Sequence, residues 1–516
     1  MEKLANKDGK HAGLVIASVL AGILFLLFFS GSTSPLSGNF YCLDSAFFQG
    51  VGKLMNSGYV MYRDIFDEKG PFMFFIEALG YSFGGRYGVF FIQILFMSAS
   101  IVMLKKCVDV ARTENKIFVF ITALMLFFIN LSFSFDCGNL SEEYALPFLF
   151  FTLYIHIRSN RDNDIKKIYM YIMGAGFGII AFTRVTNAVF ICVCMAYYLL
   201  SCLVKKEIKK AFLQTLRFLA GFCLAIAPFM IYYALKGALY DMIFATFIFG
   251  FRYATKGSFL TRFLNLRWPE TVSFALIYVF SVINCRKNIK KVLFLCISFF
   301  FNMFVLMLGY SFSHYYQIIC VAIVAAWILM FEENEAGIKA GMVTCVIAGF
   351  TVFNSYGILT QSARAVSVIF LNSEKTAQSL PGKAFMKLNE KYDLDYCGYK
   401  RKERYEDLIS RIPEEYHDSV YSYSGGSNWL LYSGMNPYNK YCQTADNFAS
   451  MSDKVAGEIE YMFKNDPPAY VITSSEAEIK NEAVSEILEN DYVIVYSNEK
   501  LVLNKSRSLS DNNSTE

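Results

Sequence analysis

Long apolar runs separated by short polar or basic stretches recur along the first 358 positions of the chain. Many of these runs come near or above the roughly 17 to 20 residues that an α-helix needs to cross the hydrocarbon of a bilayer. We expect about eleven spans on this criterion, at about 13–30, 88–104, 117–135, 143–157, 168–183, 186–204, 215–235, 271–285, 291–309, 315–331 and 339–358. The pattern predicts a polytopic α-helical membrane protein.

The composition supports the same class. Hydrophobic residues make up 55% of the 516 positions, and the mean hydropathy is +0.36. Charged residues make up 18%, below the roughly 25% that is typical of soluble domains. The net charge of +4 says little by itself, and we expect no nucleic acid partner.

Basic clusters between the apolar runs predict the topology. They are Lys105, Lys106, Arg112 and Lys116; Arg158, Arg161, Lys166 and Lys167; Lys205, Lys206, Lys209 and Lys210; and Arg286, Lys287, Lys290 and Lys291. The positive-inside rule places all of them, and the N-terminus, in the cytoplasm. This placement requires the short run 71–83, which contains Glu77, to lie along or re-enter the outer face. The C-terminus is then outside the cytoplasm.

The chain changes character after the last apolar run. Residues 359–504 are polar and alternate helix-like stretches with short β-rich runs, which predicts a small extracytoplasmic α/β domain. Residues 1–358 would form the membrane domain, with 31–87 as its first outer loop, and residues 505–516 would be a disordered tail.

The predicted outer face collects polar groups that need an explanation. They are Asp44, Asp67, Glu68 and the turn Lys69-Gly70-Pro71 in the first outer loop, then Asp136, Glu142, Glu143, Arg184, His314 and Tyr315 at later span ends. A charge this close to hydrocarbon is costly unless it is paired or in contact with water, so a functional role is the first hypothesis. Structural alternatives remain open: a helix start at Ser141, a snorkelling Arg184, an aromatic belt at His314 and simple turn chemistry at Lys69.

A carboxylate beside cations at a membrane surface suits transfer from a lipid-phosphate-linked sugar. The carboxylate would take the proton of an acceptor hydroxyl as it attacks the anomeric carbon. Arginine, lysine or histidine would neutralise the departing phosphate.

Four motifs in order carry a family resemblance over about residues 10–330. The first is the outer loop in which an Asp after the first span is followed by the turn DEKGP, and the others are the acidic motif NLSEEYALPF, then FTRVTN, then SHYYQ. Together they resemble the GT-C glycosyltransferases, in the branch of the protein O-mannosyltransferases and the aminoarabinose transferase. The resemblance implies Asp44 as catalytic base, with Glu142 or Glu143 as the second carboxylate. It also implies Lys69, Arg184, His314 and Tyr315 near the donor phosphate, with Asp67 and Glu68 supporting the loop or the acceptor. The turn reads Lys-Gly-Pro where many members have Lys-Pro-Pro, and no clean Asp-x-Asp follows, so a divalent metal cofactor stays an open alternative.

We therefore expect a glycosyltransferase, of inverting type, in the plasma membrane. Its partners would be a polyprenyl-phosphate sugar donor, membrane lipid, and an acceptor that is an envelope glycan, a glycolipid or a protein. A transporter or flippase of lipid-linked sugars is the first alternative, although it would place polar residues near the bilayer midplane. A non-catalytic membrane scaffold is the second, and it would tolerate the loss of Asp44.

Overall fold

The computed structural model describes residues 2–40, 42–162, 165–255, 258–308, 312–333, 340–392, 398–426 and 428–511. The chain forms two compact units. The first, called here the helical unit, comprises Met1–Ser30, Phe90–Ile231 and Ala254–Val366. The second, called the sheet unit, comprises Gly31–Val89, Tyr232–Tyr253 and Ser367–Glu516. The C-terminal region therefore shares a compact unit with the first outer loop.

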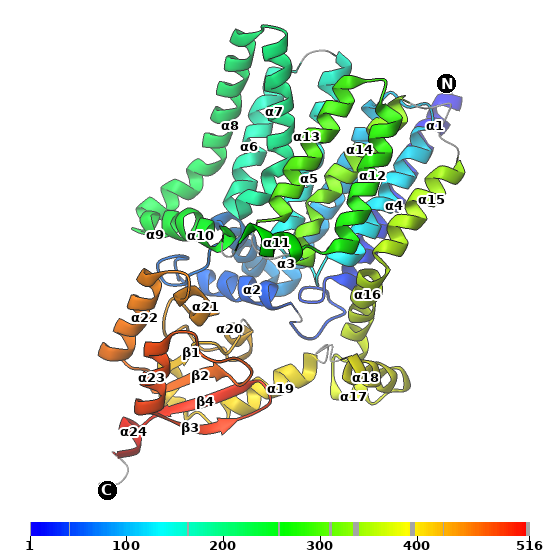
Figure 1. The fold of residues 1–516 in the computed structure, drawn as a ribbon. Helices are drawn as coiled ribbons and strands as arrows, with labels where there is room; N and C mark the ends of the chain where they lie inside the picture. The colour runs from blue at the N-terminus through cyan, green and yellow to red at the C-terminus, as the bar shows by residue number, and fades with distance from the viewer. Residues whose placement is uncertain are drawn as a thin grey trace. The chain divides into compact units, whose positions relative to one another are not determined.

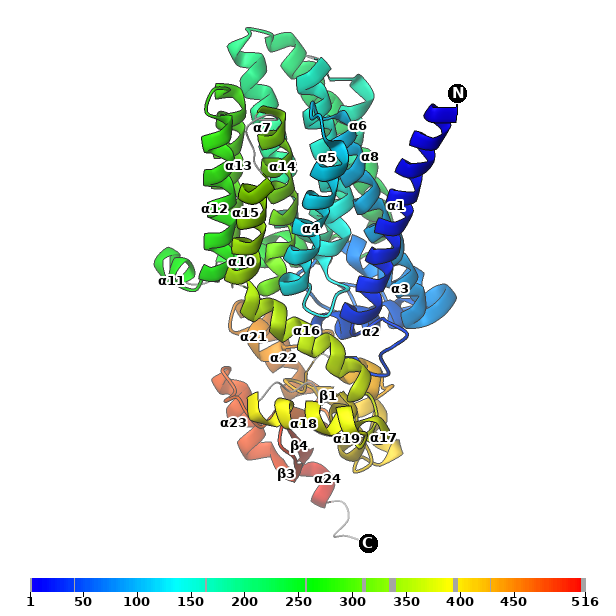
Figure 2. The ribbon, with the colours of Figure 1, turned by 90° about the vertical axis from the view of Figure 1, so that its right-hand side faces the viewer.

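The helical unit is built from helices that run side by side, as α4, α5, α13 and α14 show in Figure 2. Its elements are α1 (Glu2–Phe29), the later part of α3 (Pro71–Val110), α4 (Lys116–Ser134), α5 (Ser141–Asp162), α6 (Lys167–Arg184), η1 (Val185–Ala188), α7 (Val189–Val204), α8 (Ile208–Leu235), α11 (Phe259–Leu264), α12 (Trp268–Cys285), α13 (Ile289–Leu306), η3 (Ser313–Gln317), α14 (Ile319–Glu333) and α15 (Ala340–Phe353). The last four residues of α8 belong to the sheet unit, and two further helices, α10 (Gly250–Thr255) and α16 (Ser355–Phe370), also begin in one unit and end in the other.

The predicted class of polytopic α-helical membrane protein is confirmed, with fewer spans than expected. Among the described residues, eight helices are long and apolar enough to cross a membrane, or up to nine if α15 and α16, bent by 65°, form one broken span. The predicted spans 168–183 and 186–204 fall within the one apolar stretch Lys167–Val204. The predicted span 143–157 lies in α5, whose ends carry acidic and basic residues and lower its mean hydropathy.

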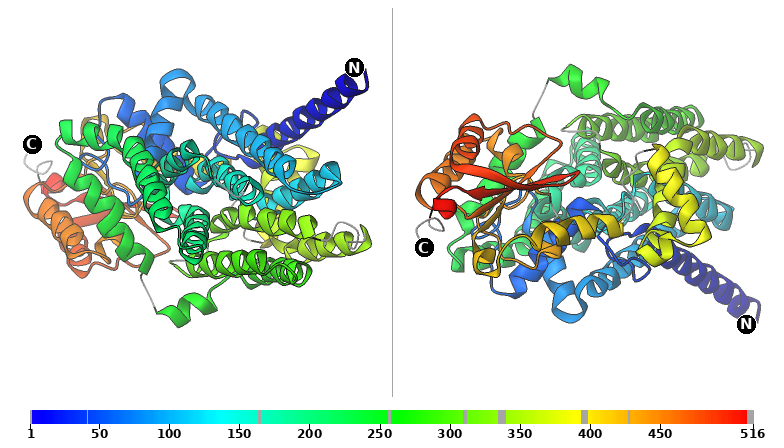
Figure 3. Two further views of the ribbon diagram at one scale, coloured as in Figure 1. Left: turned by 90° about the horizontal axis from the view of Figure 1, so that it is seen from above. Right: turned by 90° about the horizontal axis from the view of Figure 1, so that it is seen from below.

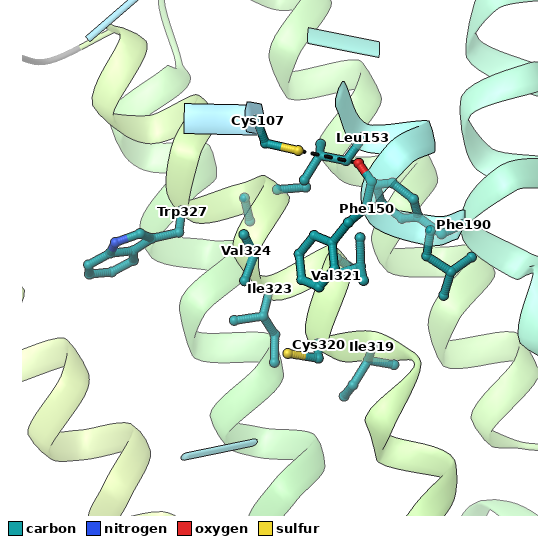
Figure 4. Close-up of a cluster of buried hydrophobic side chains, with 14 of the residues drawn as sticks. Cys107, Phe150, Leu153, Phe190, Ile319, Cys320, Val321, Ile323, Val324 and Trp327 are labelled. Atoms are coloured by element: carbon teal, nitrogen blue, oxygen red, sulfur yellow. Dashed lines mark hydrogen bonds between the residues drawn. The ribbon is translucent and has the colours of Figure 1, made fainter. Parts of the chain in front are cut away.

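The core of the helical unit is centred on α14. Every residue of an 18-residue window within the stretch Ser313–Glu332 is buried, and a helix that is apolar on all sides is one surrounded by protein. In Figure 4, Ile323 and Trp327 of this helix lie in the same apolar cluster as Cys107, whose thiol donates to the carbonyl oxygen of Phe150 at 3.3 Å. By contrast, only 17% of the apolar part of α1 is buried, and its N-terminal end projects away from the other helices of the unit (Figure 3).

Two glycines allow α6 and α8 to approach each other closely. A Cβ at Gly174 would overlap the carbonyl oxygen of Phe218, and one at Gly221 would overlap that of Tyr171. Small residues at such crossings bring helix backbones together in membranes. The close packing of α6 against α8 therefore depends on these two positions.

We expect Gly174→Ala to lower the melting temperature of the purified protein, because the added methyl group must separate α6 from α8. The expected loss is about 1 to 3 kcal/mol of unfolding free energy, as for other overpacked sites. Gly349→Ala in α15 is the matched control, since nothing lies within 4 Å of the Cβ position there. An equal loss in both variants would contradict the close crossing.

Helix α3 is interrupted at Gly85, which has φ 57° and ψ −138°. A positive φ is accessible to glycine at little cost, so this residue breaks the helix. The break falls between the run 71–83, predicted as too short to cross the membrane, and the predicted span 88–104.

The sheet unit contains a four-stranded sheet in the order β1-β2-β4-β3 (Figure 1). Its strands are β1 (Val420–Ser422), β2 (Tyr470–Ser474), β3 (Tyr492–Ser497) and β4 (Leu501–Ser506), with β1 and β2 parallel and the other pairs antiparallel. Its helices are α2 (Leu43–Asn56), the first part of α3, α9 (Leu239–Ile243), η2 (Phe244–Phe249), α17 (Glu374–Ala377), α18 (Leu380–Tyr392), α19 (Gly398–Ile409), η4 (Glu414–Ser419), α20 (Trp429–Tyr432), α21 (Ala445–Ala449), α22 (Asp453–Asn465), α23 (Glu482–Asp491) and α24 (Ser508–Asp511). The predicted small α/β region is confirmed.

Residues 505–511, which the sequence assigned to a disordered tail, form the end of β4 and helix α24. Strand β4 continues to Ser506, whose backbone N–H donates to the carbonyl oxygen of Ala469, and α24 follows it. These backbone hydrogen bonds order residues that a polar composition alone suggested were disordered. Residues 512–516 of the predicted tail lie outside the described residues.

The loop predicted to be the first outer one, 31–87, packs directly on the C-terminal region within the sheet unit. The backbone N–H of Phe66 donates to the carbonyl oxygen of Lys440 at 2.8 Å, and that of Phe40 donates to the Tyr432 hydroxyl at 3.2 Å. The ring of Phe66 lies 5.0 Å from that of Tyr441. The C-terminal region therefore supports the loop that carries the first predicted site residues.

Candidate functional site

The first group of predicted site residues, called here the loop cluster, consists of Asp44, Asp67, Glu68 and Lys69. Helix α2 begins at Leu43 and carries Asp44 in its first turn, where a carboxylate interacts favourably with the helix dipole. The apolar face of α2, including Phe47 and Val51, is buried. Burial of this face fixes the orientation of α2 and hence the position of Asp44.

A tightly hydrogen-bonded turn brings Lys69 to the other members of the loop cluster. Tyr62, which has a positive φ of 74°, donates its hydroxyl to the carbonyl oxygen of Lys69 at 2.6 Å. The Lys69 backbone N–H donates to Asp67 Oδ1 at 2.9 Å. The Lys69 ammonium lies 3.1 Å from Glu68 Oε1 and 5.1 Å from the centre of the Phe48 ring.

Asp44 differs from the other carboxylates of the loop cluster. Its side chain is half-buried, and within the described part of the chain it makes no hydrogen bond or ion pair. Its charge nevertheless acts on both Asp67 and Lys69. The loop cluster thus contains one unengaged carboxylate within electrostatic range of a lysine.

The loop cluster holds unusual protonation states. Burial, with the charge of Glu68, raises the pKa of Asp67 to about 7. Burial opposes the charge on Lys69, but the neighbouring carboxylates outweigh it and raise the pKa of the ammonium. Lys69 is therefore a permanent cation, and Asp67 titrates near neutral pH.

We expect Asp67→Asn to remove a pH dependence of stability between pH 5 and 7. The folded protein keeps a proton on Asp67 over a range where the unfolded chain, with a pKa of 3.8, has lost it. Wild-type stability should therefore fall relative to the variant by up to about 1.4 kcal/mol per pH unit as the pH rises, and level off above pH 7. Melting temperatures from pH 5 to 8 would test this. Asp64→Asn is the control, because the Arg63 guanidinium lowers the pKa of Asp64; the same slope change there would contradict the assignment.

The second group, called here the helix-end cluster, belongs to the helical unit and consists of Asp136, Glu142, Arg184, His314, Tyr315 and Arg364. It is organised by the turn between α4 and α5, in which all four residues 136–139 have positive φ values. Only Gly138 adopts this conformation without cost, and such strain is concentrated at functional sites. The backbone of this turn is therefore strained, and the packing around it keeps the turn in this conformation.

Arg184 is held between an acidic and an aromatic side chain. Its Nη1 lies 3.0 Å from Glu142 Oε1, and its guanidinium carbon lies 3.7 Å from the centre of the Tyr315 ring. Glu142 is buried, whereas the Arg184 side chain is 20% exposed. One carboxylate contact leaves guanidinium donors that are free to reach a bound anion. The structure brings together the three residues that the sequence predicted here.

Asp136 is held between His314 and an arginine that the sequence analysis missed. Asp136 Oδ2 lies 3.2 Å from His314 Nδ1, and Oδ1 lies 2.8 Å from Arg364 Nη1. Burial opposes the charge of Asp136, but His314 and Arg364 together lower its pKa. The signal for Arg364 was present: it is the lone charged residue of the apolar helix α16, and such a residue needs a partner or a function.

Glu143 lies in a separate hydrogen-bond network of the helical unit. The Gln93 amide donates to both of its carboxylate oxygens, at 3.1 and 3.0 Å, and the Asn139 backbone N–H donates to Oε2 at 2.9 Å. These contacts fix the strained turn to α3. Gln93 was missed because an amide within a long apolar run gave no sequence signal.

No metal site is evident in the part of the chain that the structure describes. No group of three or more His, Cys, Asp or Glu side chains there has an arrangement that would hold a metal ion. The loop cluster and the helix-end cluster each offer cations for an anionic ligand.

Comparisons with known proteins connect this geometry to a fold. The model of the family described as "Putative competence-induced protein Ccs4 N-terminal domain" matches residues 14–363. ArnT from Cupriavidus metallidurans bound to undecaprenyl phosphate is 12% identical, with a TM-score of 0.57 over 95% of this chain and 98% of that chain. The apo state of ArnT gives the same identity and TM-score over 96% and 98%.

A further similar structure is the archaeal oligosaccharyltransferase AglB from Archaeoglobus fulgidus in complex with an inhibitory peptide and a dolichol-phosphate. It is 11% identical, and the alignment covers 97% of this chain and 75% of that chain with a TM-score of 0.47. No curated protein matches the sequence. The likeness to ArnT confirms the resemblance to the GT-C glycosyltransferases at the level of the fold.

Proposed function

Since the chain belongs to the Ccs4 N-terminal domain family and has the fold of ArnT, we propose that it is a membrane glycosyltransferase. It moves a sugar from a polyprenyl phosphate to an acceptor outside the cytoplasm. The matched ArnT structure contains undecaprenyl phosphate, which supports a polyprenyl phosphate as the carrier here.

The proposed reaction is a displacement at the anomeric carbon of the donor sugar. The acceptor hydroxyl oxygen forms a bond to this carbon, and its proton passes to the Asp44 carboxylate. The bond from the anomeric carbon to the phosphate oxygen breaks, and the electron pair leaves with the polyprenyl phosphate. A single displacement of this kind inverts the configuration of the sugar.

The observation that carries the proposal is that Asp44 has no hydrogen-bond or ion-pair partner among the described residues, whereas the other predicted catalytic carboxylates do. Glu142 is paired with Arg184, and Glu143 accepts hydrogen bonds from Gln93. Asp44 is unengaged among the described residues, so its oxygens are available to a substrate hydroxyl. We therefore assign the base to Asp44 and give Glu142 the role of positioning Arg184.

The family resemblance, and not the placement of the two units, is the basis for assigning Lys69, Arg184 and His314 to the phosphate of the donor. Lys69 supplies a half-buried ammonium close to Asp67 and Glu68. Arg184 supplies a guanidinium, a planar donor that grips phosphate in bidentate fashion, and His314 supplies a further donor. Tyr315 holds the Arg184 plane by stacking. These groups would stabilise the negative charge that grows on the leaving phosphate.

Transfer by the purified protein tests this function. The full chain in lipid nanodiscs would be incubated with a panel of polyprenyl-phosphate sugars and an extract of envelope lipids and glycans. We expect release of the polyprenyl phosphate, coupled to the appearance of a glycosylated acceptor. Donors that all stay intact, in a preparation whose melting transition shows a folded protein, would contradict the proposal.

A further inference from the structure

The helical unit contains a cavity of about 610 Å³ that lies at the opposite end of its helices from the helix-end cluster. It is lined by the C-terminal half of α5, by α7 from Cys194 onward, by the end of α14, and by the first two turns of α6, α8 and α13. Along α5, Arg161 of this cavity and Glu142 of the helix-end cluster are separated by about 28 Å, at a rise of about 1.5 Å per residue. The cavity is therefore separate from the helix-end cluster.

Basic residues outnumber acidic residues in the lining of the cavity. They are Arg112, Arg161, Lys205, Lys210, Lys290 and Lys291. Only Glu207 and Glu332 oppose them in the lining, and Glu332 is bound to Lys291 at 2.9 Å. In the described part of the chain, neither Lys205 nor Lys290 forms an ion pair. Glu207 lies 3.5 Å from Lys210, and Arg161 is bound to Asp162 at 3.1 Å. The excess of positive charge in the lining therefore lies at Lys205 and Lys290.

The positions of these lysines favour an anion between them. Lys290 and Lys291 lie in the first turn of α13, and Lys210 lies in the first turn of α8. The helix dipole is positive at an N-terminus, so these lysines add to the positive potential there instead of neutralising it. An anion in the cavity would be stabilised by both the side chains and the helix ends.

The apolar lining indicates that the anion belongs to a lipid. Leu200, Val204 and Leu293 line the cavity and are also exposed on the outer surface, Val204 to 84%. In a membrane protein, exposed apolar side chains at helix ends contact lipid tails. The wall of the cavity thus continues onto the lipid-facing surface, and a chain attached to the anion can leave along it.

We propose that this cavity binds a membrane lipid with a phosphate head group. The phosphate lies among Lys205, Lys290 and their basic neighbours, and the lipid tail follows Leu200 and Val204. Basic residues at this end also define the predicted cytoplasmic side, so the ligand would come from the cytoplasmic leaflet. The proposal is independent of the proposed transfer activity.

Two matched double variants test the lipid site. The cavity variant, Lys205→Gln with Lys290→Gln, removes two exposed lysines that line the cavity. The control variant, Lys206→Gln with Lys287→Gln, removes two exposed lysines from the same two interhelical connections, and neither of these lysines lines the cavity. Native mass spectrometry of the full chain would measure the binding of phosphatidylglycerol, with phosphatidylcholine and inorganic phosphate as separate probes.

We expect phosphatidylglycerol to bind to the wild type and to the control variant, and about tenfold or more weaker to the cavity variant, as two lost lysine–phosphate contacts require. Phosphatidylcholine should bind weakly to all three proteins. Equal weakening in both double variants would show a general attraction to basic loops and overturn the proposal. Displacement of phosphatidylglycerol by millimolar inorganic phosphate would overturn the lipid assignment in favour of a free anion. Unchanged melting temperatures would confirm that the variants remain folded.

Discussion

Replacing Asp44 with Asn is expected to lower the rate of sugar transfer by about 10² to 10⁴, the range for a lost general base. The amide has nearly the same shape as the carboxylate but does not accept the proton of the acceptor hydroxyl. Because Asp44 makes no hydrogen bond or ion pair among the described residues, the substitution leaves no partner unsatisfied. The rate should therefore fall in a protein that remains folded, with the free energy of unfolding lowered by only about 0.3 to 1 kcal/mol from the lost charge at the start of α2.

Asp64→Asn provides the control for this measurement. Asp64 lies in the same outer loop, but it is bound to Arg63 at 2.7 Å and is not a member of the loop cluster. Initial rates of polyprenyl phosphate release would be compared at saturating donor. Full activity in Asp44→Asn would show that Asp44 is not the general base, without contradicting the proposal that the protein is a glycosyltransferase. Equal losses of transfer rate in both variants would show that activity depends on the intact loop and not on Asp44 in particular.

Replacing Arg184 with Met is expected to lower the free energy of unfolding by about 3 kcal/mol or more, because the buried Glu142 carboxylate loses its counterion. Arg158→Met is the matched control, since its partner Asp162 is 37% exposed and exposed ion pairs contribute little to stability. Denaturation in detergent would measure both variants. A loss in the control as large as that in Arg184→Met would contradict this interpretation.

A double variant separates the structural role of Arg184 from its proposed role on the phosphate. Adding Glu142→Gln to Arg184→Met removes the uncompensated charge, so we expect most of the stability to return. Transfer activity should stay lost, because no guanidinium remains to hold the leaving phosphate. If the double variant is as unstable as the single one, stacking of Arg184 on Tyr315 is the main stabilising contact instead.

The local elements were predictable because each depends on residues near one another in the sequence. The four strands of the C-terminal sheet follow short β-rich runs, and the pattern of apolar runs predicted the helices. The number of spans was harder to predict, because α5 carries charges at both ends and α6 meets α7 at the short break η1. Hydropathy alone does not distinguish two short spans from one broken one.

The pairing of the site residues was not predictable, since it depends on which helix faces which. The sequence indicated that Glu142, Arg184 and His314 were candidates, but not that Arg184 would be held by Glu142 and Tyr315. Arg364 was missed as a partner of Asp136 because the two residues are 228 positions apart. An apolar pattern predicts that a helix is buried without predicting its neighbours.

The packing of the first outer loop on the C-terminal region has a consequence for biosynthesis. Phe40 is bound to Tyr432 across 392 positions, so the ribosome completes the loop long before it makes the loop's partner. Contacts of such long range form late in folding, and the loop cluster cannot reach its final geometry until the last part of the chain has been made. A chain that terminates early would insert its helices into the membrane and remain without an ordered loop around Asp44. Completion of the C-terminal region would thus act as a checkpoint that keeps unfinished molecules inactive.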